Sequence, residues 1–380
     1  MSFEKLGLHN SILSTLSQLN FEKPYPIQTE AIPAAIAKKD ILGIAKTGSG
    51  KTASFVLPIL HNIIQDAPNK NRHINALIVV PTRELAIQVH EVLTSFSRQL
   101  PRRVKTMAVY GGVSINPQMM KMNGVEILVA TPGRLLELIE NKALYLTSVK
   151  TLVLDEADKM LNLGFKDEMD RILGLLPKKR QNLLFSATLS EGIQDISRVL
   201  LHDPITIKIE AKEDNIELIK QKAYGVTEER KGPLLRYLIK TNNYKQILIF
   251  ASTVYKVDNV ADKLRKNGIN AQAIHAKKSQ KARTAALSDF KNGHLKVLVA
   301  TDLLARGIDI EFLPCVINYE LPRSPKDYVH RIGRTGRAES PGDAISLITP
   351  EEQHHFRVIQ KKMKKWVDMV ESDEIDLHGM

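Results

Sequence analysis

Cysteine is nearly absent from this chain, and several other features that mark whole classes of protein are missing as well. Cys315 is the only cysteine among 380 residues, which excludes a disulfide framework and a cysteine-rich zinc site. No apolar run reaches the length that spans a membrane, and the N-terminus lacks the basic-then-apolar pattern of a signal peptide. We therefore expect a cytoplasmic protein, in a reducing compartment, that does not enter a membrane.

Acidic residues are fewer than basic ones. The chain has 42 Asp and Glu against 54 Lys and Arg, a formal net charge of +12. An excess of this size favours a polyanionic partner, and nucleic acid is the natural candidate, although many basic proteins bind none. Low-complexity tracts are also absent, and the length exceeds what one hydrophobic core usually serves. We expect two globular domains, and charge alone does not establish what they bind.

Short apolar runs alternate with helical stretches, a pattern that predicts parallel strands joined by crossover helices. The first series of runs covers residues 41–44, 76–80, 127–130, 151–154 and 182–185, with a closing strand at 205–209. The second series covers residues 246–250, 271–274, 296–300, 315–319 and 343–348. The halves share this rhythm without a visible sequence repeat. Two α/β domains in tandem are therefore expected.

The expected linker is the polar segment 210–217, which is poor in apolar periodicity. It separates a first domain at 1–209 from a second domain at 218–350, and a C-terminal segment follows at 351–380. After Pro350 this segment is predicted to be one helix, followed by a short tail with acidic residues. The helix carries Lys361, Lys362, Lys364 and Lys365. For these lysines a solvated helix face is favoured over a dedicated binding patch.

Residues 45–52, Ala-Lys-Thr-Gly-Ser-Gly-Lys-Thr, lie between the first predicted strand and an apolar helix. This arrangement is typical of a phosphate-binding loop, in which glycines let backbone N–H groups surround the phosphates. Lys51 would reach the β and γ phosphates, and the Thr52 hydroxyl would ligate magnesium. Ala45 stands where the general pattern has its first glycine, which is tolerable if residue 45 keeps a negative φ. A glycine-rich turn that binds nothing is the alternative.

A phosphate-binding loop requires a carboxylate at the end of another strand to hold magnesium. The run at 151–154 leads directly into Asp155, which we predict to be that carboxylate. Glu156 follows and can reach the water that attacks the γ-phosphate, so it is the candidate for orienting or deprotonating that water. A chance acidic cluster on a surface loop is the alternative, and the apolar strand before it speaks against that. ATP and Mg²⁺ are the predicted substrate and cofactor.

With these residues in place, the chain resembles the DEAD-box RNA helicases from Phe3 to about Thr349. Asp155-Glu156-Ala157-Asp158 matches the block that gives this family its name. The other family blocks occur in the family's order, at residues 81–86, 111–112, 131–134, 186–188, 280 with 283, 300–309 and 330–337. One such block is weak evidence, whereas the ordered set leaves little room for coincidence. The sequence of residues 111–120 is most similar to that of the bacterial RhlE-type branch.

The resemblance implies two tandem RecA-like domains, each a mostly parallel sheet flanked by helices, with a nucleotide and RNA cleft between them. It implies an RNA-dependent ATPase and helicase with the catalytic residues Lys51, Asp155, Glu156, Arg334 and Arg337. Arg334 and Arg337 correspond to arginine fingers and, three residues apart, are expected to share one helical turn. The implied ATP-binding residues are Phe21, Gln28, Thr47, Gly48, Ser49, Gly50, Lys51, Thr52 and Asp309, with Thr52 and Asp155 on Mg²⁺.

Residues 21–28 are similar to the family's adenine-reading motif. The Gln28 amide offers a donor beside an acceptor, which matches the N6 and N7 edge of adenine. Phe21 is placed to stack on the base and Phe3 matches the motif's upstream aromatic residue, although core packing is the competing interpretation for each. Asn20 and Ala276 stand where the family usually has glycine, so a backbone that needs φ above zero would put these two turns in question.

The RNA contacts implied by the resemblance lie on strand-to-helix loops. They are Pro81, Arg83, Gly112, Thr131, Gly133 and Arg134 in the first domain and Gln280, Arg283 and Thr301 in the second. Such loops can bind phosphates without reading bases, so binding should be largely sequence-independent. Ser186, Thr188 and His330 would couple the ATP and RNA sites, with a satisfied histidine as an equal alternative for His330. We expect a monomer that works by closure of its domains.

Two rival functions remain open at this point. A DNA helicase or translocase on the same architecture predicts ATP hydrolysis that DNA stimulates at least as well as RNA does. An idle clamp that binds RNA without turnover predicts the loss of a catalytic residue. The adenine-reading block argues against the first rival, and the intact Lys51, Asp155, Glu156, Arg334 and Arg337 argue against the second.

Overall fold

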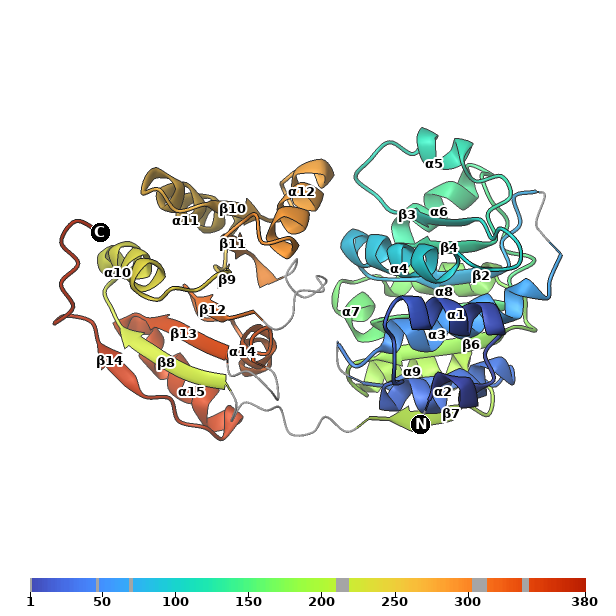
Figure 1. The fold of residues 1–380 in the computed structure, drawn as a ribbon, viewed down its shortest axis with the longest axis horizontal. Coiled ribbons are helices and arrows are strands. Elements are labelled where there is room, and N and C mark those ends of the chain that lie inside the picture. Colours follow the sequence, from blue (N-terminus) through green and yellow to red (C-terminus); the bar gives the residue numbers. More distant parts are fainter. Residues whose placement is uncertain (1, 46–47, 68–70, 210–218, 303–312, 337–341) are drawn as a thin grey trace. The chain divides into compact units, whose positions relative to one another are not determined.

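The computed structural model describes residues 2–45, 48–67, 71–209, 219–302, 313–336 and 342–380. The chain divides into two compact units, Met1–Ala211 and Lys212–Met380. Each unit is a sheet with helices on both faces (Figure 1). The predicted linker, 210–217, lies outside the described residues. In the described part of the chain, no helix combines the length and the apolar character needed to cross a membrane.

The first unit contains a seven-stranded sheet in the order β3-β4-β2-β5-β6-β1-β7. Every pairing among these strands is parallel. The strands are β1 (Ile41–Ile44), β2 (Ala76–Val79), β3 (Thr106–Val109), β4 (Ile127–Ala130), β5 (Thr151–Leu154), β6 (Gln181–Ser186) and β7 (Ile205–Lys208). The central strands are buried along their whole length, as parallel strands covered on two faces must be.

Helices cover both faces of this sheet. They are η1 (Phe3–Leu6), α1 (Asn10–Gln18), α2 (Pro26–Ile36), α3 (Lys51–Ile64), α4 (Arg83–Phe96), α5 (Asn116–Met120), α6 (Pro132–Glu140), α7 (Ala157–Asn162), α8 (Lys166–Leu175) and α9 (Glu191–Leu200). One core cluster joins α1–α4 to alternate strand residues such as Ile41 and Val153. A second cluster joins α6–α9 to the intervening residues, such as Leu42 and Leu152. This is the period of two that a strand imposes on its side chains.

The second unit repeats the architecture, in the order β10-β11-β9-β12-β13-β8-β14. Its strands are β8 (Ile219–Gly225), β9 (Ile247–Phe250), β10 (Ala271–Ile274), β11 (Val297–Ala300), β12 (Cys315–Asn318), β13 (Gly342–Ile348) and β14 (Met369–Glu371). Its helices include α10 (Glu228–Thr241), α11 (Val254–Lys266), α12 (Gln280–Lys291), α14 (Pro325–Ile332), η3 (Pro350–Glu352) and α15 (Gln353–Met363). Strand for strand, this order is the one found in the first unit, so the shared rhythm of the sequence reflects one repeated fold.

The predicted strands are confirmed to within one residue at each end, and three strands were missed. β3 is an edge strand whose first residues are only partly buried. β8 has three successive polar residues, Lys220, Gln221 and Lys222. β14 is short and exposed, and it pairs only with β8. β3 and β14 lie at the edges of their sheets, and β8 lies next to an edge. Each of the three lacks the continuous run of buried apolar residues by which most of the other strands were found.

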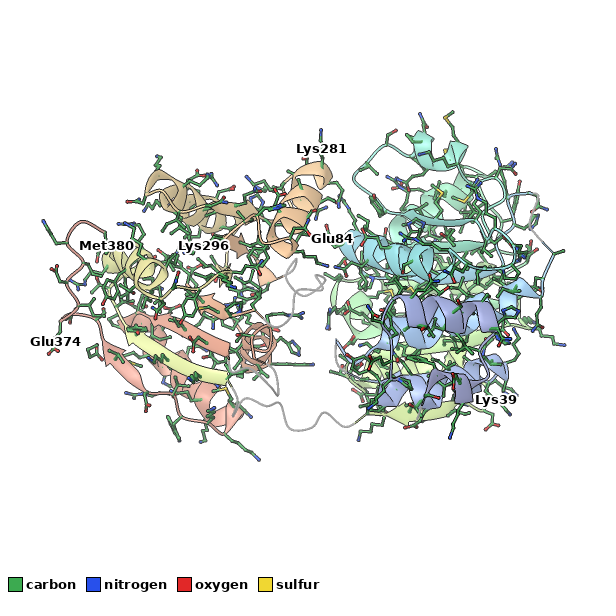
Figure 2. The ribbon with its side chains drawn as sticks, in the orientation of Figure 1. Lys39, Glu84, Lys281, Lys296, Glu374 and Met380 are labelled. Carbon is green, nitrogen blue, oxygen red and sulfur yellow. The ribbon has the colours of Figure 1, made fainter. Side chains whose placement is uncertain are left out.

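The prediction for the C-terminal segment was wrong in two respects. The helix α15 ends at Met363, because Lys364 adopts the left-handed conformation with φ of 55°. Lys364 and Lys365 therefore lie beyond the helix. The remainder is also more than a tail, since it forms β14 and continues past α10 through Glu374 to Met380 (Figure 2). The Arg230 guanidinium donates to the carbonyls of Ser372 and Ile375 and so holds this segment on the unit.

Candidate active site

The loop between β1 and α3 has the backbone of a phosphate-binding loop. Gly48 and Gly50 have φ of 80° and 86°, in the left-handed region that favours glycine. Ala45 is not among the residues with positive φ, so the condition that made alanine acceptable there is met. Lys51 is buried at the start of α3, and its ammonium donates to the Ala45 carbonyl at 2.7 Å. The predicted Thr47 lies outside the described residues.

Gln28 connects the adenine-reading block to this loop. Its side chain is buried, with 1% exposed. The amide oxygen accepts from the Tyr25 backbone N–H at 2.9 Å, and the amide nitrogen donates to the Gly50 carbonyl at 3.0 Å. A Cβ on Gly50 would collide with this nitrogen, which is a second reason for glycine at that position. One N–H and one lone pair of the amide remain for a ligand.

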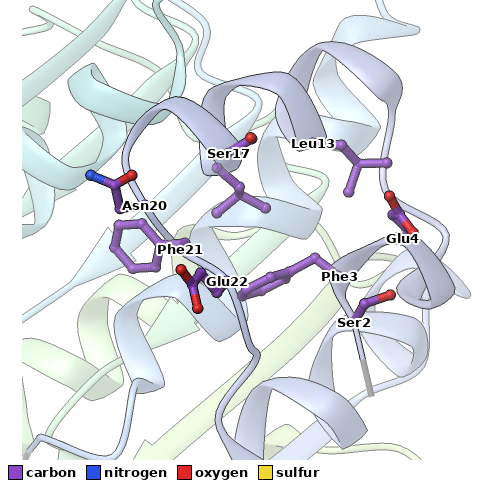
Figure 3. Close-up of a pocket in the computed structure, with 9 residues that line it drawn as sticks. Ser2, Phe3, Glu4, Leu13, Ser17, Asn20, Phe21 and Glu22 are labelled. Carbon is purple, nitrogen blue, oxygen red and sulfur yellow. The ribbon is translucent and has the colours of Figure 1, made fainter.

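A pocket of about 390 Å³ opens beside the same block, with Phe3 and Phe21 in its lining (Figure 3). Phe3 is buried in the core, which agrees with the alternative interpretation that this residue has a packing role. Phe21 is 39% exposed, and its ring meets Phe96 edge-on at a centroid distance of 5.4 Å. Asn20 has φ of 58°, a conformation that asparagine tolerates better than most residues. The turn therefore keeps a left-handed residue even without the family's usual glycine.

Asp155 and Glu156 lie directly after β5, and both carboxylates are buried. Burial raises the pKa of Asp155 to about 6; Lys51 opposes the shift, the Glu156 carboxylate adds to it, and Lys159 opposes it. Asp155 accepts from the Glu156 N–H at 3.0 Å. Glu156 has φ of 54°, which is uncommon for a non-glycine residue and typical of strain held at a functional position.

The Glu156 carboxylate is only half satisfied within the protein. Oε1 forms an ion pair with Lys159 at 2.7 Å. Oε2 is buried and has no hydrogen-bond partner among the residues that the structure describes. A buried carboxylate oxygen without a partner is costly, so its position favours a donor brought by a ligand or a water.

Magnesium suits the donor set at this edge of the sheet. Asp155 offers carboxylate oxygens and Thr52, in the first turn of α3, offers a hydroxyl, and such hard oxygen ligands are those that Mg²⁺ prefers. Within the described ranges no group of three or more His, Cys, Asp and Glu side chains could form a complete metal site. Magnesium that is shared with a phosphate normally takes only one or two protein carboxylates. The residues present therefore fit the ion.

Asp158, which was not among the predicted site residues, contacts one of the predicted coupling residues. Its carboxylate accepts from the Thr188 hydroxyl at 3.0 Å. The Ser186 hydroxyl donates to the Thr188 carbonyl at 2.8 Å and accepts from the Thr188 N–H at 3.3 Å. The predicted coupling residues Ser186 and Thr188 are thus bonded to the acidic block that follows β5. The presence of Asp158 in that block was the available signal.

Three of the predicted RNA-binding loops of the first unit lie close together. Gly112 has φ of 73°, and a Cβ there would collide with the Arg83 guanidinium, so the two loops approach closely. Arg134 donates to the Val113 carbonyl at 2.7 Å and to Glu137 at 2.8 Å. The Arg134 side chain is buried, so it braces the loops from within.

The other predicted RNA contacts of this unit also lie where strands end. Pro81 follows β2, and Thr131 is the buried residue before α6. Gly133 is in the first turn of α6, and a Cβ there would meet no atom within 4 Å. Within the described part of the chain, no neighbouring atom requires glycine at this position. The open space favours close approach of a ligand to the helix N-terminus.

In the second unit the predicted RNA contacts lie at the equivalent ends of β10 and β11. Gln280 begins α12 and accepts from the Arg283 guanidinium, while Thr301 follows β11. Ala276 is not among the residues with positive φ, so alanine is compatible with that turn. Asp309 and Arg337, predicted for ATP, lie outside the described residues.

The expectation that Arg334 shares a helical turn with Arg337 is wrong. α14 ends at Ile332, and Thr335 forms a β-bridge with Leu313. The φ of Gly336, at 79°, turns the backbone further from a helix. Arg334 is therefore buried in a turn after the helix, while His330 is exposed on the last turn of the helix. Spacing alone could not show that a long-range bridge ends this helix.

Arg331 lies between these residues in the sequence and holds a buried hydrogen-bond network that was not predicted. Its guanidinium donates to both Asp302 oxygens, at 2.8 Å for the Nη2 bond, and to Asn318 at 3.0 Å. It also lies 4.9 Å from the centre of the Phe250 ring. The side chain is 2% exposed, so this network ties Asp302 to the ends of β9 and β12.

Comparison with known proteins covers both units. A family model for the DEAD/DEAH box helicase matches residues 25–196, and a model for the helicase conserved C-terminal domain matches residues 230–339. The chain is 42% identical over 364 residues to the ATP-dependent RNA helicase CshA of Listeria monocytogenes, with 96% of this chain and 69% of that protein covered. It is 38% identical to the DEAD-box ATP-dependent RNA helicase CshA of Bacillus subtilis, covering 99% and 75%.

Among solved structures, Saccharomyces cerevisiae Dbp5 bound to RNA and ADP BeF3 is 30% identical to this chain, with a TM-score of 0.84. The match covers 99% of this chain and 97% of Dbp5. The relatives named above carry the name CshA, so the resemblance to the RhlE-type branch stays a prediction. Agreement at the level of sequence, domain and fold establishes that the chain belongs to the DEAD-box family of ATP-dependent RNA helicases, which couple RNA-stimulated ATP hydrolysis to unwinding or remodelling of RNA.

Proposed function

We propose that ATP is hydrolysed in the first unit, between the loop after β1 and the end of β5. The observation that carries this assignment is the pair of buried carboxylates, Asp155 and Glu156, close enough to Lys51 for its charge to act on the pKa of Asp155. Lys51 would move from the Ala45 carbonyl to the β and γ phosphates. Glu156, with one free oxygen, would orient the attacking water and accept its proton.

Asp155 and Thr52 would hold Mg²⁺ together with phosphate oxygens. When bound, the ion supplies positive charge against the charge that develops on the phosphoryl oxygens. Asp155 is suited to this role because its buried carboxylate has a raised pKa, which is the sign of a charge that lacks full compensation inside the protein.

Adenine recognition is assigned to Gln28 and Phe21. The remaining N–H and lone pair of the Gln28 amide match the N6 and N7 edge of the base, and Phe21, in the same sequence block, presents an exposed ring. Because Gln28 is bonded to Gly50, a base on this amide would act directly on the loop formed by Gly48, Ser49 and Gly50. The identity of the base would thereby affect how the loop binds the phosphates.

RNA would bind through its backbone at the strand ends of both units, with little preference for sequence. The close approach of these loops supports Arg83, Gly112, Thr131 and Gly133 as contacts in the first unit, and Pro81 is proposed with them. For Arg134 we propose two roles, which are to hold the loop at Val113 in place and to contact RNA. Gln280, Arg283 and Thr301 are the corresponding proposals for the second unit. Contacts with 2′-hydroxyls would distinguish RNA from DNA.

We further propose that ATP and RNA together favour closure of the two units. Each ligand would touch both units and bind the closed state more tightly, which is what makes a ligand shift such an equilibrium. Arg334, Arg337 and Asp309 would then complete the nucleotide site, with the arginines on the γ-phosphate. The Thr188–Asp158 bond gives Ser186 and Thr188 a direct route for coupling, and His330 would contribute from the second unit.

The remaining proposals concern organisation. We assign residues 1–209 and 218–350 to two RecA-like domains, 210–217 to the linker and 351–380 to a C-terminal segment that the second domain incorporates. We propose a monomer in the cytoplasm, and the buried, unpaired Cys315 suits a reducing compartment. We assign the chain to the RhlE-type branch on the sequence of residues 111–120 alone.

The deciding experiment measures ATP hydrolysis by the purified chain with single-stranded RNA, with duplex DNA and without nucleic acid. We expect marked stimulation by RNA only. Lys51→Ala should abolish turnover under all three conditions, and it therefore controls for a contaminating ATPase. Equal stimulation by DNA would favour the rival translocase. An ATP hydrolysis rate that RNA does not change would refute the proposal.

A further inference from the structure

The only tryptophan of the chain is left at the surface. Trp366 is 73% exposed. It ends the segment 361–366, Lys-Lys-Met-Lys-Lys-Trp, which we call the Lys–Trp turn. None of the predicted ATP or RNA residues lies in this segment. An exposed indole in a lysine-rich segment therefore lies outside the site already described.

The Lys–Trp turn is an ordered part of the second unit. Lys364 ends α15 in the left-handed conformation, and the Lys365 N–H donates to the Gln360 carbonyl at 3.3 Å. The Val367 N–H donates to the Gln360 side chain at 2.8 Å, and Val367 itself is buried in the core. Trp366 is thus held between two anchored residues. Its exposure belongs to a folded turn and is not the result of a fraying end.

Four lysines lie within five residues of Trp366 in the sequence, and three of them have no acidic partner in the part of the chain that the structure describes. Among the described residues, Lys361, Lys362 and Lys364 form no ion pair within 4.0 Å. Other lysines of the same unit are paired, such as Lys256 with Glu228 and Glu320. Beyond the turn the chain enters β14, whose neighbour β8 carries the exposed Lys220 and Lys222.

We propose that the Lys–Trp turn is an auxiliary binding surface for single-stranded RNA, with a base stacked on Trp366 and phosphates held by the lysines. Stacking on an aromatic ring and a positive track for the backbone are the two elements of sequence-independent binding to single strands. A protein partner fits less well, because lysine is depleted in protein–protein interfaces. The inference rests on RNA being the ligand of this family, and it adds a site on the second unit.

Intrinsic fluorescence tests the proposal directly, because Trp366 is the only tryptophan and reports on this turn alone. The full chain is titrated with a single-stranded uridine oligonucleotide in the absence of ATP. We expect saturable quenching that weakens as salt is raised. Unchanged fluorescence at RNA concentrations that saturate stimulation of the ATPase would overturn the proposal. Quenching by an RNA duplex but not by the single strand would also overturn it, since paired bases cannot stack on the indole.

Variants separate the turn from the general charge of the protein. Trp366→Ala should weaken binding of labelled oligonucleotide by roughly 5- to 100-fold, and Trp366→Phe should restore most of it. The triple change Lys361→Gln, Lys362→Gln and Lys364→Gln should lower the slope of log affinity against log salt by about 2. The turnover number at saturating RNA should stay unchanged in each case.

A matched control changes three exposed lysines elsewhere on the unit, Lys240→Gln, Lys263→Gln and Lys266→Gln. These lysines lie on α10 and α11, so affinity should change much less than in the turn variant. Equal losses in the two triple variants would mean that net charge alone matters, and the proposal would fail. If RNA quenched Trp366 fluorescence but did not stimulate the ATPase, the auxiliary site would be supported and the proposed function would be refuted.

Discussion

The two units use the same strand order and differ in the loops at the ends of their strands. In the first unit, the connection between β1 and α3 includes Gly48 and Gly50, both with positive φ. In the second unit, only residues 226–227 separate the equivalent strand β8 from α10, whose first turn carries Glu228 and Glu229. A short connection that leads into acidic residues cannot surround a phosphate and would repel it. The fold provides the frame, and the loop decides which unit binds the nucleotide.

The strand ends show a second difference. Glu156 lies two residues past β5, and Glu320 lies two residues past the equivalent strand β12. Glu320 bonds Lys256 through one oxygen and accepts from the Ser252 N–H at 2.7 Å through the other. Glu156 has a partner for one oxygen only among the described residues. A carboxylate that the protein satisfies is structural, whereas a buried one left half satisfied is ready for a ligand.

The largest expected effect comes from removing the charge of Glu156. Glu156→Gln should lower ATP turnover at saturating RNA by about 10²–10⁴-fold, because the general base is lost. ATP and RNA should still bind, which trapping of labelled RNA would detect. Glu320→Gln is the matched control and should keep most of the turnover. Wild-type turnover in Glu156→Gln would show that this residue was wrongly assigned.

Arg331→Ala should have the next largest effect, on stability. It takes the buried guanidinium away from Asp302, and breaking a buried ion pair in this way costs about 3–5 kcal/mol. Urea unfolding followed by Trp366 fluorescence reports on the second unit alone, since no other tryptophan exists. Arg323→Ala, at an exposed position, serves as the control and should change the unfolding free energy by less than about 0.5 kcal/mol. A small effect of Arg331→Ala would mean that the network is dispensable.

Thr188→Val should separate ATP hydrolysis from unwinding. The change removes the bond to Asp158, worth about 1.5–3 kcal/mol for a charged acceptor. We expect duplex unwinding to fall by about tenfold while RNA-stimulated hydrolysis falls less, as parallel assays would show. Thr206→Val, on the exposed face of β7, should leave both activities intact. Proportional losses of the two activities would argue against a coupling role.

The smallest effect should be a gain in stability. Asp155→Asn removes a buried charge, so without nucleotide and magnesium the first unit should become more stable by about 1–2 kcal/mol while losing activity. Hydrogen exchange of the amides on β5 and β6 measures this. Asp302→Asn is the counterpart in the second unit and should instead destabilise, because it weakens the partner of Arg331. Stabilisation in both units would erase the proposed difference between them.

Much of the fold could be read from the chain because its signals are local. Apolar runs predicted the buried strands, and glycines with Lys51 and Thr52 marked the loop after β1. The missed elements are those without a local signal. β14 is short, exposed and paired only with β8, which lies far from it in the chain. The end of α14 was misjudged because a bridge between Leu313 and Thr335, distant in sequence, ends it.

The sequence by itself determined which residue types stand at the strand ends, and hence the phosphate-binding loop and the carboxylates after β5. Only the tertiary structure decided which of those polar groups are already satisfied. Gln28 is bonded to Gly50, Thr188 to Asp158 and Arg331 to Asp302, while one oxygen of Glu156 has no partner in the described part of the chain. Covalent order fixes neighbours along the chain. Hydrogen bonds between residues 22 to 30 positions apart exist only once packing has brought them together.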